Sequence, residues 1–233
     1  MLPRLHGIKE IALDLLFPQR CVGCGEEGEL ICPVCERSLL RIIPPVCPRC
    51  GKPHPGSSVC AGCVNWQASI DGIRSPFRFD GTIRQAIHQF KYNNLRALAV
   101  PLSCLLRDYI TSNPIPADFL VPVPLHPKRL RERGYNQSVL LAQKLGKLIT
   151  RPVVEDCLIR VRLALPQAST ANVAERRRNV AGAFSCRDGR VQNRTVLLID
   201  DVATSGATLD ACASALKAGG AAQIWGLVLA REI

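Results

Sequence analysis

Eight cysteines in four C-x-x-C pairs lie between Cys21 and Cys63 and restrict how the first part of this 233-residue chain can fold. A C-x-x-C pair puts two thiolates on one tight turn, and two such turns complete the tetrahedral set of sulfurs that structural zinc prefers. The segment has few large apolar residues and cannot fold by burial alone, whereas zinc binding to such peptides supplies ~10–16 kcal/mol. The sequence therefore predicts two structural zinc ions. The eight predicted ligands are Cys21, Cys24, Cys32, Cys35, Cys47, Cys50, Cys60 and Cys63.

The spacing of the pairs leaves two ways to build the zinc sites. Sequential pairing places the first two C-x-x-C pairs around one ion and the last two around the other, whereas cross-brace pairing interleaves them. Gly25 and Gly51 follow the second cysteine of a pair and suit the positive φ that a knuckle turn needs there. Disulfides are disfavoured, because we expect no secretory signal and cytosolic thiols stay reduced.

The apolar patterns give the expected location and domain organisation. Lys9, Glu10 and Asp14 interrupt the apolar N-terminal stretch, which is therefore no signal peptide. No apolar run approaches the ~20 residues of a membrane-spanning helix. We expect a cytoplasmic protein without a transmembrane segment. Residues 1–66 are predicted to hold an N-terminal helix (residues 8–18) and a double zinc ribbon, and residues 67–233 a second domain.

Beyond Trp66, strand and helix patterns alternate along the chain. Strands are predicted at residues 72–81, 118–124, 194–200 and 222–230, and helices at residues 82–94, 95–110, 136–149 and 208–220. The continuous apolar run of residues 194–200 is typical of a strand buried on both faces of a parallel sheet. The pattern predicts an α/β fold, with a loosely structured segment at residues 163–179.

Two adjacent acids, Asp200 and Asp201, end that apolar run and precede a loop of small residues. Ligands of parallel sheets bind beyond the carboxyl ends of the strands, and the helix N-terminus after the loop favours an anion. Gly206 lets the backbone approach closely, and Thr204 and Ser205 offer hydroxyl groups. Because the acids would repel a phosphate, they are better suited to sugar hydroxyls or Mg2+. The combination predicts a ribose 5-phosphate ligand.

The stretch "VLLIDDVATSGAT" resembles the phosphoribosyl pyrophosphate (PRPP) signature of type I phosphoribosyltransferases. Together with the zinc knuckles, "VPVPLHPKRLRERGYNQS" and "ERRRNVAGAF", nearly the whole chain resembles the ComF family of bacterial competence-associated proteins, including its GntX type. The resemblance implies a type I phosphoribosyltransferase fold that binds PRPP with Mg2+. It implies that Asp200 and Asp201 are the catalytic pair, on the ribose 2- and 3-hydroxyls. The residues implied for the 5-phosphate are Ala203, Thr204, Ser205, Gly206, Ala207 and Thr208.

The net charge of +11 is concentrated in one stretch, because residues 121–180 carry twelve Lys/Arg against four Asp/Glu. Such a field attracts polyanions. Lys128, Arg129 and Arg133, with Arg131 beside them, are candidates for binding pyrophosphate. The basic run Arg176, Arg177 and Arg178 is a candidate for closing over the site as a flexible loop or for holding a nucleic acid backbone.

Two functions from different classes fit these residues. The first is phosphoribosyl transfer to an acceptor that the sequence does not identify, in a protein associated with competence, DNA uptake or DNA utilisation. The second is a non-enzymatic, zinc-dependent factor that binds single-stranded DNA, works with the DNA-uptake machinery and uses the PRPP pocket as an effector site. The aromatic content of 5% disfavours the second, because aromatic stacking usually supports single-strand binding.

Overall fold

The computed structural model describes residues 18–56, 58–162 and 173–233. The helix predicted at residues 8–18 lies outside this range except for its last residue. Residues 163–172, the first part of the segment predicted as loosely structured, also lie outside it.

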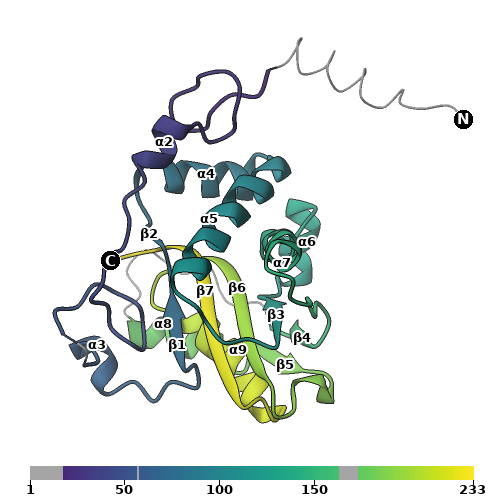
Figure 1. Cartoon of the computed structure of the whole chain (residues 1–233). Helices are drawn as coiled ribbons and strands as arrows, with labels where there is room; N and C mark the ends of the chain where they lie inside the picture. Colours follow the sequence, from purple (N-terminus) through teal and green to yellow (C-terminus); the bar gives the residue numbers. More distant parts are fainter. Residues whose placement is uncertain (1–17, 57, 163–172) are drawn as a thin grey trace, which may run out of the picture.

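A five-stranded parallel sheet forms the centre of the molecule (Figure 1). Its order is β1–β7–β6–β3, and β2 pairs with β7 further along the same edge. The predicted strand at residues 72–81 is divided into two short strands around Ser75 and Pro76, because a proline has no N–H for the ladder. The strands are β1 (Gly72–Arg74), β2 (Phe77–Arg78), β3 (Phe119–Pro122), β6 (Thr195–Ala203) and β7 (Gln223–Arg231).

Helices cover both faces of the sheet, so the predicted α/β fold is confirmed (Figure 1). Alternate residues of β6 show the two cores: Leu197 and Ile199 pack with residues of α4, α5 and α7, whereas Leu198 packs with residues of α9. An antiparallel pair, β4 and β5, lies beside α9. The bounds are α4 (Gly81–Tyr92), η1 (Arg96–Leu98), α5 (Ala99–Ser112), α7 (Gln137–Leu148), β4 (Leu158–Arg160), β5 (Phe184–Cys186), η2 (Gly189–Val191) and α9 (Ala207–Ala218).

Outside the cysteine-rich segment, two α-helices were not predicted where the structure has them. The basic stretch with the pyrophosphate candidates, for which no helix was predicted, forms α6 (Pro127–Arg133), because Pro127 suits a first helical position and His126 Nδ1 accepts the N–H of Lys128 at 3.2 Å. Gly134, at φ +78°, ends this helix. Within the segment expected to be loosely structured, α8 (Val173–Val180) is helical and packs beside α9.

The cysteine-rich segment adds two short helices, α2 (Pro33–Arg37) and α3 (Ala61–Val64), each beginning directly after a cysteine. Its first half joins the core of α4 and α5, whereas its second half joins the core of α9. The two halves thus join the cores on opposite sides of the sheet. Across residues 18–56, 58–162 and 173–233, none of the helices has the length and apolar character needed to cross a bilayer.

Candidate functional site

The eight paired cysteines form two separate groups of four. Within each group, all four sulfurs lie within 4.8 Å of one another. The Cys24–Cys32 and Cys50–Cys60 sulfur pairs are both 3.7 Å apart. A tetrahedron with Zn–S bonds of ~2.3 Å has S···S edges of about 3.8 Å, so both groups have the size of a zinc site. Tetrad 1 consists of Cys21, Cys24, Cys32 and Cys35, and tetrad 2 of Cys47, Cys50, Cys60 and Cys63.

The backbone around each tetrad is arranged to receive thiolates. The N–H of Cys32 points to the sulfur of Cys21, and the N–H of Cys60 to the sulfur of Cys47, both at 3.4 Å. Burial opposes ionisation of Cys21 and Cys47, but backbone N–H groups lower the pKa of each thiol to about 6. Gly25 and Gly51 have positive φ, as predicted. The pairing is sequential, and these residues fit a structural zinc ion in each group.

The loop after β6 has the shape of an anion cradle. Gly206, at φ +79°, precedes the twelve-residue helix α9, whose first N–H groups therefore face the carboxyl end of β6. A Cβ on Gly206 would lie 2.8 Å from Ile73 Cδ1, so the residue must also be small. The loop encloses a cavity of 90 Å³, lined by residues 202–209 together with Asp200 and Val180.

The adjacent acids have different surroundings. Asp200 lines the cavity, and its Oδ1 accepts hydrogen bonds from Ser138 Oγ at 2.8 Å and from the N–H of Asp201 at 3.0 Å. Asp201 is only 3% exposed, and its Oδ1 lies 2.7 Å from Nζ of Lys91 in α4. Its Oδ2 is buried and has no hydrogen-bond partner in the described part of the chain. Only one carboxylate of the pair therefore faces the cavity directly.

The charge states of this cluster follow from its burial. Burial and the charge of Asp201 raise the pKa of Asp200 to about 7, although Lys91 and Ser138 oppose the shift. Burial alone would lower the pKa of Lys91, but the carboxylates of Asp201 and Asp200 raise it. Lys91 therefore stays charged. Neither Lys91 nor Ser138 was predicted as a site residue. Each comes from a helix distant in sequence from Asp200, and although Ser138 ends the quoted stretch "VPVPLHPKRLRERGYNQS", nothing in that stretch marks its hydroxyl as a partner of Asp200.

The predicted pyrophosphate residues are distributed along α6. Lys128, Arg129 and Arg131 are exposed, whereas the guanidinium of Arg133 lies 5.3 Å from the ring centroid of Tyr92. Arg160 of β4 was not predicted. Burial and the charge of Arg129 lower its pKa and Asp200 opposes them, so Arg129, Arg160 and Asp200 share one electrostatic neighbourhood.

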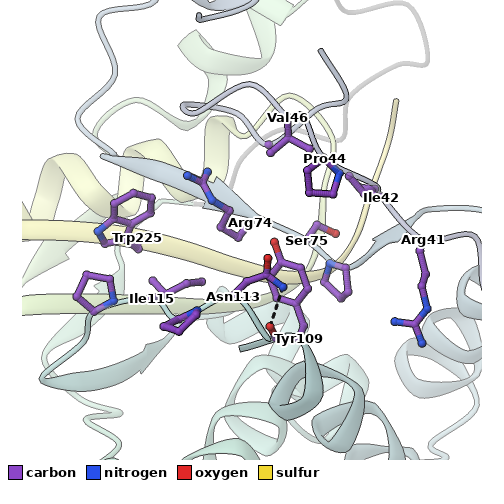
Figure 2. A pocket seen from close by; sticks show the side chains of 14 residues that line it. Arg41, Ile42, Pro44, Val46, Arg74, Ser75, Tyr109, Asn113, Ile115 and Trp225 are labelled. Carbon is purple, nitrogen blue, oxygen red and sulfur yellow. Dashed lines mark hydrogen bonds between the residues drawn. The ribbon is translucent and has the colours of Figure 1, made fainter. Parts of the chain in front are cut away.

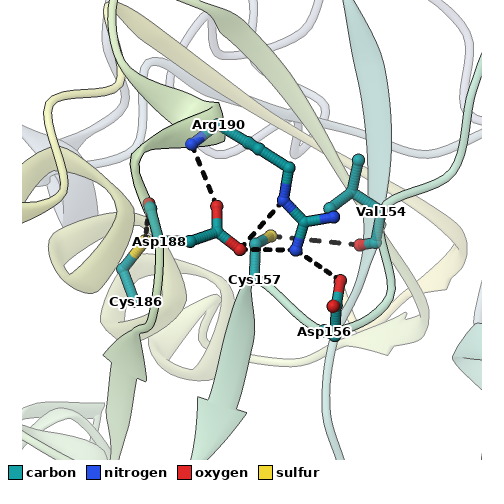
Figure 3. A network of polar contacts seen from close by, with 6 residues as sticks. All are labelled: Val154, Asp156, Cys157, Cys186, Asp188 and Arg190. Carbon is teal, nitrogen blue, oxygen red and sulfur yellow. Dashed lines mark hydrogen bonds and ion pairs between the residues drawn. The ribbon is translucent and has the colours of Figure 1, made fainter.

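The strand that carries Arg160 is fixed by a polar network (Figure 3). Arg190 Nη2 lies 2.6 Å from Oδ1 of Asp156, and its Nε lies 2.9 Å from Oδ2 of Asp188. Cys186 and Cys157 lie beside this network. Because Asp156 precedes β4 and Asp188 follows β5, Arg190 ties the two strands together. Of the predicted run in α8, Arg178 is exposed, and the side chains of Arg176 and Arg177 lie outside the description.

The chain combines a double zinc ribbon with a parallel α/β domain in which a loop of small residues joins the end of β6 to the N-terminus of α9. The Double zinc ribbon domain family matches residues 12–64. "DNA utilization protein YhgH" of Salmonella typhi is 32% identical over 84% of this chain and 88% of its own length. "Competence protein ComFC" of Bacillus subtilis is 29% identical over 98% of this chain and 97% of its own length. The chain thus belongs to the ComF family of competence and DNA utilization proteins.

Solved structures similar to this chain include phosphoribosyltransferases. The glutamine PRPP amidotransferase of B. subtilis matches 55% of this chain and 26% of its own, with 19% identity and a TM-score of 0.39. The purine phosphoribosyltransferase of Pyrococcus horikoshii matches 56% of this chain and 71% of its own, with 13% identity and a TM-score of 0.35. The family assignment comes from the sequence relatives above.

Proposed function

We propose that this protein binds PRPP, or a related ribose 5-phosphate compound, at the carboxyl end of β6. The observation that carries the proposal is the shared cavity of Asp200 and the α9 N-terminus. A phosphate fits backbone N–H groups at a helix N-terminus, and a carboxylate accepts hydrogen bonds from vicinal hydroxyls. These two groups on one sugar define a ribose 5-phosphate.

Different residues bind different groups of the proposed ligand. Residues 203–208 hold the 5-phosphate, and Asp200 accepts a ribose hydroxyl. Asp201 acts through its ion pair with Lys91, which fixes the strand end. Lys128, Arg129 and Arg133 remain proposed partners of the pyrophosphate, and Arg160 joins them because the charges of Arg129 and Asp200 both act on its guanidinium. Mg2+ bound with PRPP neutralises pyrophosphate oxygens.

If the protein turns its ligand over, the reaction is displacement of pyrophosphate from C1 of the ribose by an acceptor. The bond from C1 to pyrophosphate breaks, positive charge develops on the sugar, and the acceptor forms the new bond to C1. The chain contributes by orienting the ribose on Asp200 and by neutralising the leaving group with α6 and Arg160. The acceptor class is left to experiment.

The alternative function is favoured by the surface of α6. Lys128, Arg129 and Arg131 are all exposed on this one short helix, where they can contact successive phosphates of a single strand. The names of the relatives connect the family with competence and DNA utilisation, and we propose the same setting for this chain. The proposed division at Trp66 would then separate a zinc module, residues 1–66, from the ligand-binding domain, residues 67–233. Eight thiols in zinc-binding arrangement fit the reducing cytoplasm.

The test is titration of the zinc-loaded protein with PRPP and Mg2+ by calorimetry. We expect binding between ~1 μM and ~1 mM, the range typical of substrates. Asp200→Asn should weaken this binding at least about tenfold, as loss of a charged hydrogen bond does. Asp118→Asn is the matched control, because Asp118 caps the opposite end of β6 through the N–H of Thr195. Binding that is absent from the wild type, or equal in both variants, contradicts the proposal.

A further inference from the structure

A cavity of 430 Å³ lies between the cysteine-rich segment and the α/β domain (Figure 2). Residues 41–46, which join the two tetrads, line it from one side, and the end of β1, the end of α5 and Trp225 of β7 line it from the other. Trp225 pairs with Leu197 near the start of β6, whereas the loop cavity lies beyond the end of that strand. Among the described residues, the two cavities share no lining residue, so they are separate sites.

The positive charge of this cavity is not compensated by a neighbouring acid. Arg41 and Arg74 line the cavity, and no acidic residue of the described part of the chain does. Neither arginine forms an ion pair within that part of the chain. Arg74 donates through Nη1 alone, to the carbonyl oxygens of Pro48 at 2.8 Å and Ile73 at 2.9 Å. Its Nε and Nη2 therefore remain available as donors to a ligand.

Aromatic rings hold the two guanidinium groups. The guanidinium of Arg74 lies over the ring of Trp225, 5.0 Å from its centroid, and that of Arg41 lies over the ring of Phe77 at 5.4 Å. A guanidinium stacked on a ring keeps the N–H groups at its edge free, and two of them can bind one oxyanion. Arg74 is half-buried, so its charge is screened less than that of an exposed arginine. The cavity is therefore suited to one anionic group.

Most of the remaining lining is apolar and rigid. Four prolines and three aliphatic residues contribute to it, together with Tyr109 of α5. Because the ring of a proline fixes φ, such a wall is largely formed before a ligand arrives. Asn113, at the end of α5, adds an amide whose Nδ2 donates to the carbonyl oxygen of Tyr109 at 3.0 Å (Figure 2). This lining favours an apolar ring and offers few partners to a strongly hydrated ligand such as a sugar phosphate.

We propose that this cavity binds a small aromatic anion, an apolar ring system that carries one carboxylate or sulfonate group. The anionic group pairs with Nε and Nη2 of Arg74, and Arg41 adds positive charge to the same cavity. The ring system lies against Trp225, Tyr109 and the prolines. A cavity of 430 Å³ is within the range of small-molecule sites, ~300–1,000 Å³. The ligand would contact residues 41–46 and the α/β domain at once, and this site does not depend on PRPP binding.

The first test is a fluorescence titration of the full-length, zinc-loaded protein with two probes. Anilinonaphthalene sulfonate (ANS) is an aromatic anion, and phenylnaphthylamine has the same rings without the charge. Arg74→Met should weaken ANS binding at least about tenfold and change binding of the neutral probe less than about threefold. Arg78→Met is the matched control, because Arg78 lies on the adjacent β2, is exposed and does not line the cavity. No binding of ANS to the wild type, or equal losses for both probes in Arg74→Met, overturns the proposal.

The second test keeps Arg74 and fills the cavity, so it remains decisive even if Arg74→Met does not fold. Ile115→Trp places a larger side chain among the lining residues and should weaken binding of both probes at least about tenfold. Val100→Trp is the matched control, because Val100 is exposed on α5 and does not line the cavity. Thermal unfolding and zinc content show that both variants are folded. Binding to Ile115→Trp that equals binding to Val100→Trp overturns the location of the site.

A competition experiment separates this proposal from the proposed function. Saturating PRPP with Mg2+ should leave ANS bound, because the two cavities have no described lining residue in common. Displacement of ANS by PRPP would place the probe at the loop after β6 and overturn the second site. If the wild type does not bind PRPP, the proposed function fails, yet the variants of Arg74 and Ile115 still test the aromatic-anion site.

Discussion

The Nζ atom of Lys91 lies 2.7 Å from Oδ1 of Asp201, so one of the two adjacent acids of β6 is neutralised inside the protein by a cation from α4. Asp201 is 3% exposed and lies beside Asp200. Its negative charge disfavours ionisation of Asp200 and so raises the pKa of that carboxyl group. This ion pair joins α4 to β6, the strand that carries the candidate ligand site. Its strength should therefore be visible in the stability of the whole domain.

Lys91→Met should destabilise the protein by roughly 3 kcal/mol, because it leaves a buried carboxylate without its partner. Urea unfolding of the zinc-loaded protein measures this change. Adding Asp201→Asn to Lys91→Met should restore a large part of the loss, since the unpaired charge is then absent. A double variant no more stable than Lys91→Met would show that the side chain of Lys91 contributes by packing instead.

The stability of the protein should depend on the protonation of Asp200. Its pKa is raised to about 7 in the folded protein and returns to its ordinary value near 4 on unfolding, so the folded state holds the extra proton between these limits. Stability from this group is therefore lost as pH rises from about 4 to about 7 and stays constant above. Asp200→Asn lacks this titrating group, so its unfolding free energy should increase relative to that of the wild type as pH rises from about 4 to about 7. A difference independent of pH would contradict the burial of Asp200.

Gly206→Ala should cost about 1–2 kcal/mol from its positive φ and a further amount from crowding by Ile73 and Trp66. Gly182→Ala is the matched control, because Gly182 also has positive φ but nothing within 4 Å of a Cβ. Thermal unfolding of the two variants gives the crowding as their difference. Calorimetry with PRPP should show weaker binding for Gly206→Ala only.

Metal analysis should find two zinc ions per chain. Removing a ligand by Cys32→Ala should reduce the content to one ion and unfold the region around tetrad 1, because zinc supplies the folding free energy of such segments. Cys104→Ala is the control, since Cys104 lies in α5 outside both tetrads and should leave two ions bound. A content of two in Cys32→Ala would mean that the tetrad does not bind zinc through that cysteine.

If α6 binds single-stranded DNA, affinity should fall steeply with salt. Each phosphate contact contributes a slope of about −0.7 in the plot of log affinity against log salt concentration. Lys128→Ala and Arg129→Ala should each reduce the slope by about that amount. Lys217→Ala is a control far from α6, on α9, and should leave it unchanged. A DNA affinity of the wild type that does not change with salt concentration would contradict binding of DNA phosphates by α6.

Local patterns predicted most of the fold. The C-x-x-C pairs and Gly25 with Gly51 define the knuckles, and the continuous apolar run before Asp200 defines a buried parallel strand. The sequential pairing of the C-x-x-C pairs could be decided only from the structure, because the cysteine spacing also permits a cross-brace arrangement. Helix α6 had visible signals in Pro127 and Gly134, but its charged residues were interpreted only as pyrophosphate candidates and no helix was predicted.

Contacts between residues far apart in the chain could not be predicted from the sequence. Lys91 and Asp201 are 110 positions apart, and nothing local marks either as the partner of the other. The side of the strand that each acid occupies depends on β6 lying between α4 and α9. Arg160 comes under the influence of the Asp200 charge from β4, which pairs with β5 beside α9. Such roles follow from tertiary packing, which one sequence without its fold does not specify.

The adjacency of the two acids limits how much negative charge the ligand meets. Side chains at neighbouring positions of a strand point to opposite faces of the sheet, so the proposed PRPP ligand would meet the carboxylate of Asp200 and not that of Asp201. Two acids placed two positions apart would point to the same face of the sheet, and both carboxylates would then repel an anionic ligand there. The doublet therefore ties the end of β6 to α4 through Asp201 and leaves Asp200 for the proposed ribose, without a second carboxylate beside the proposed phosphate site.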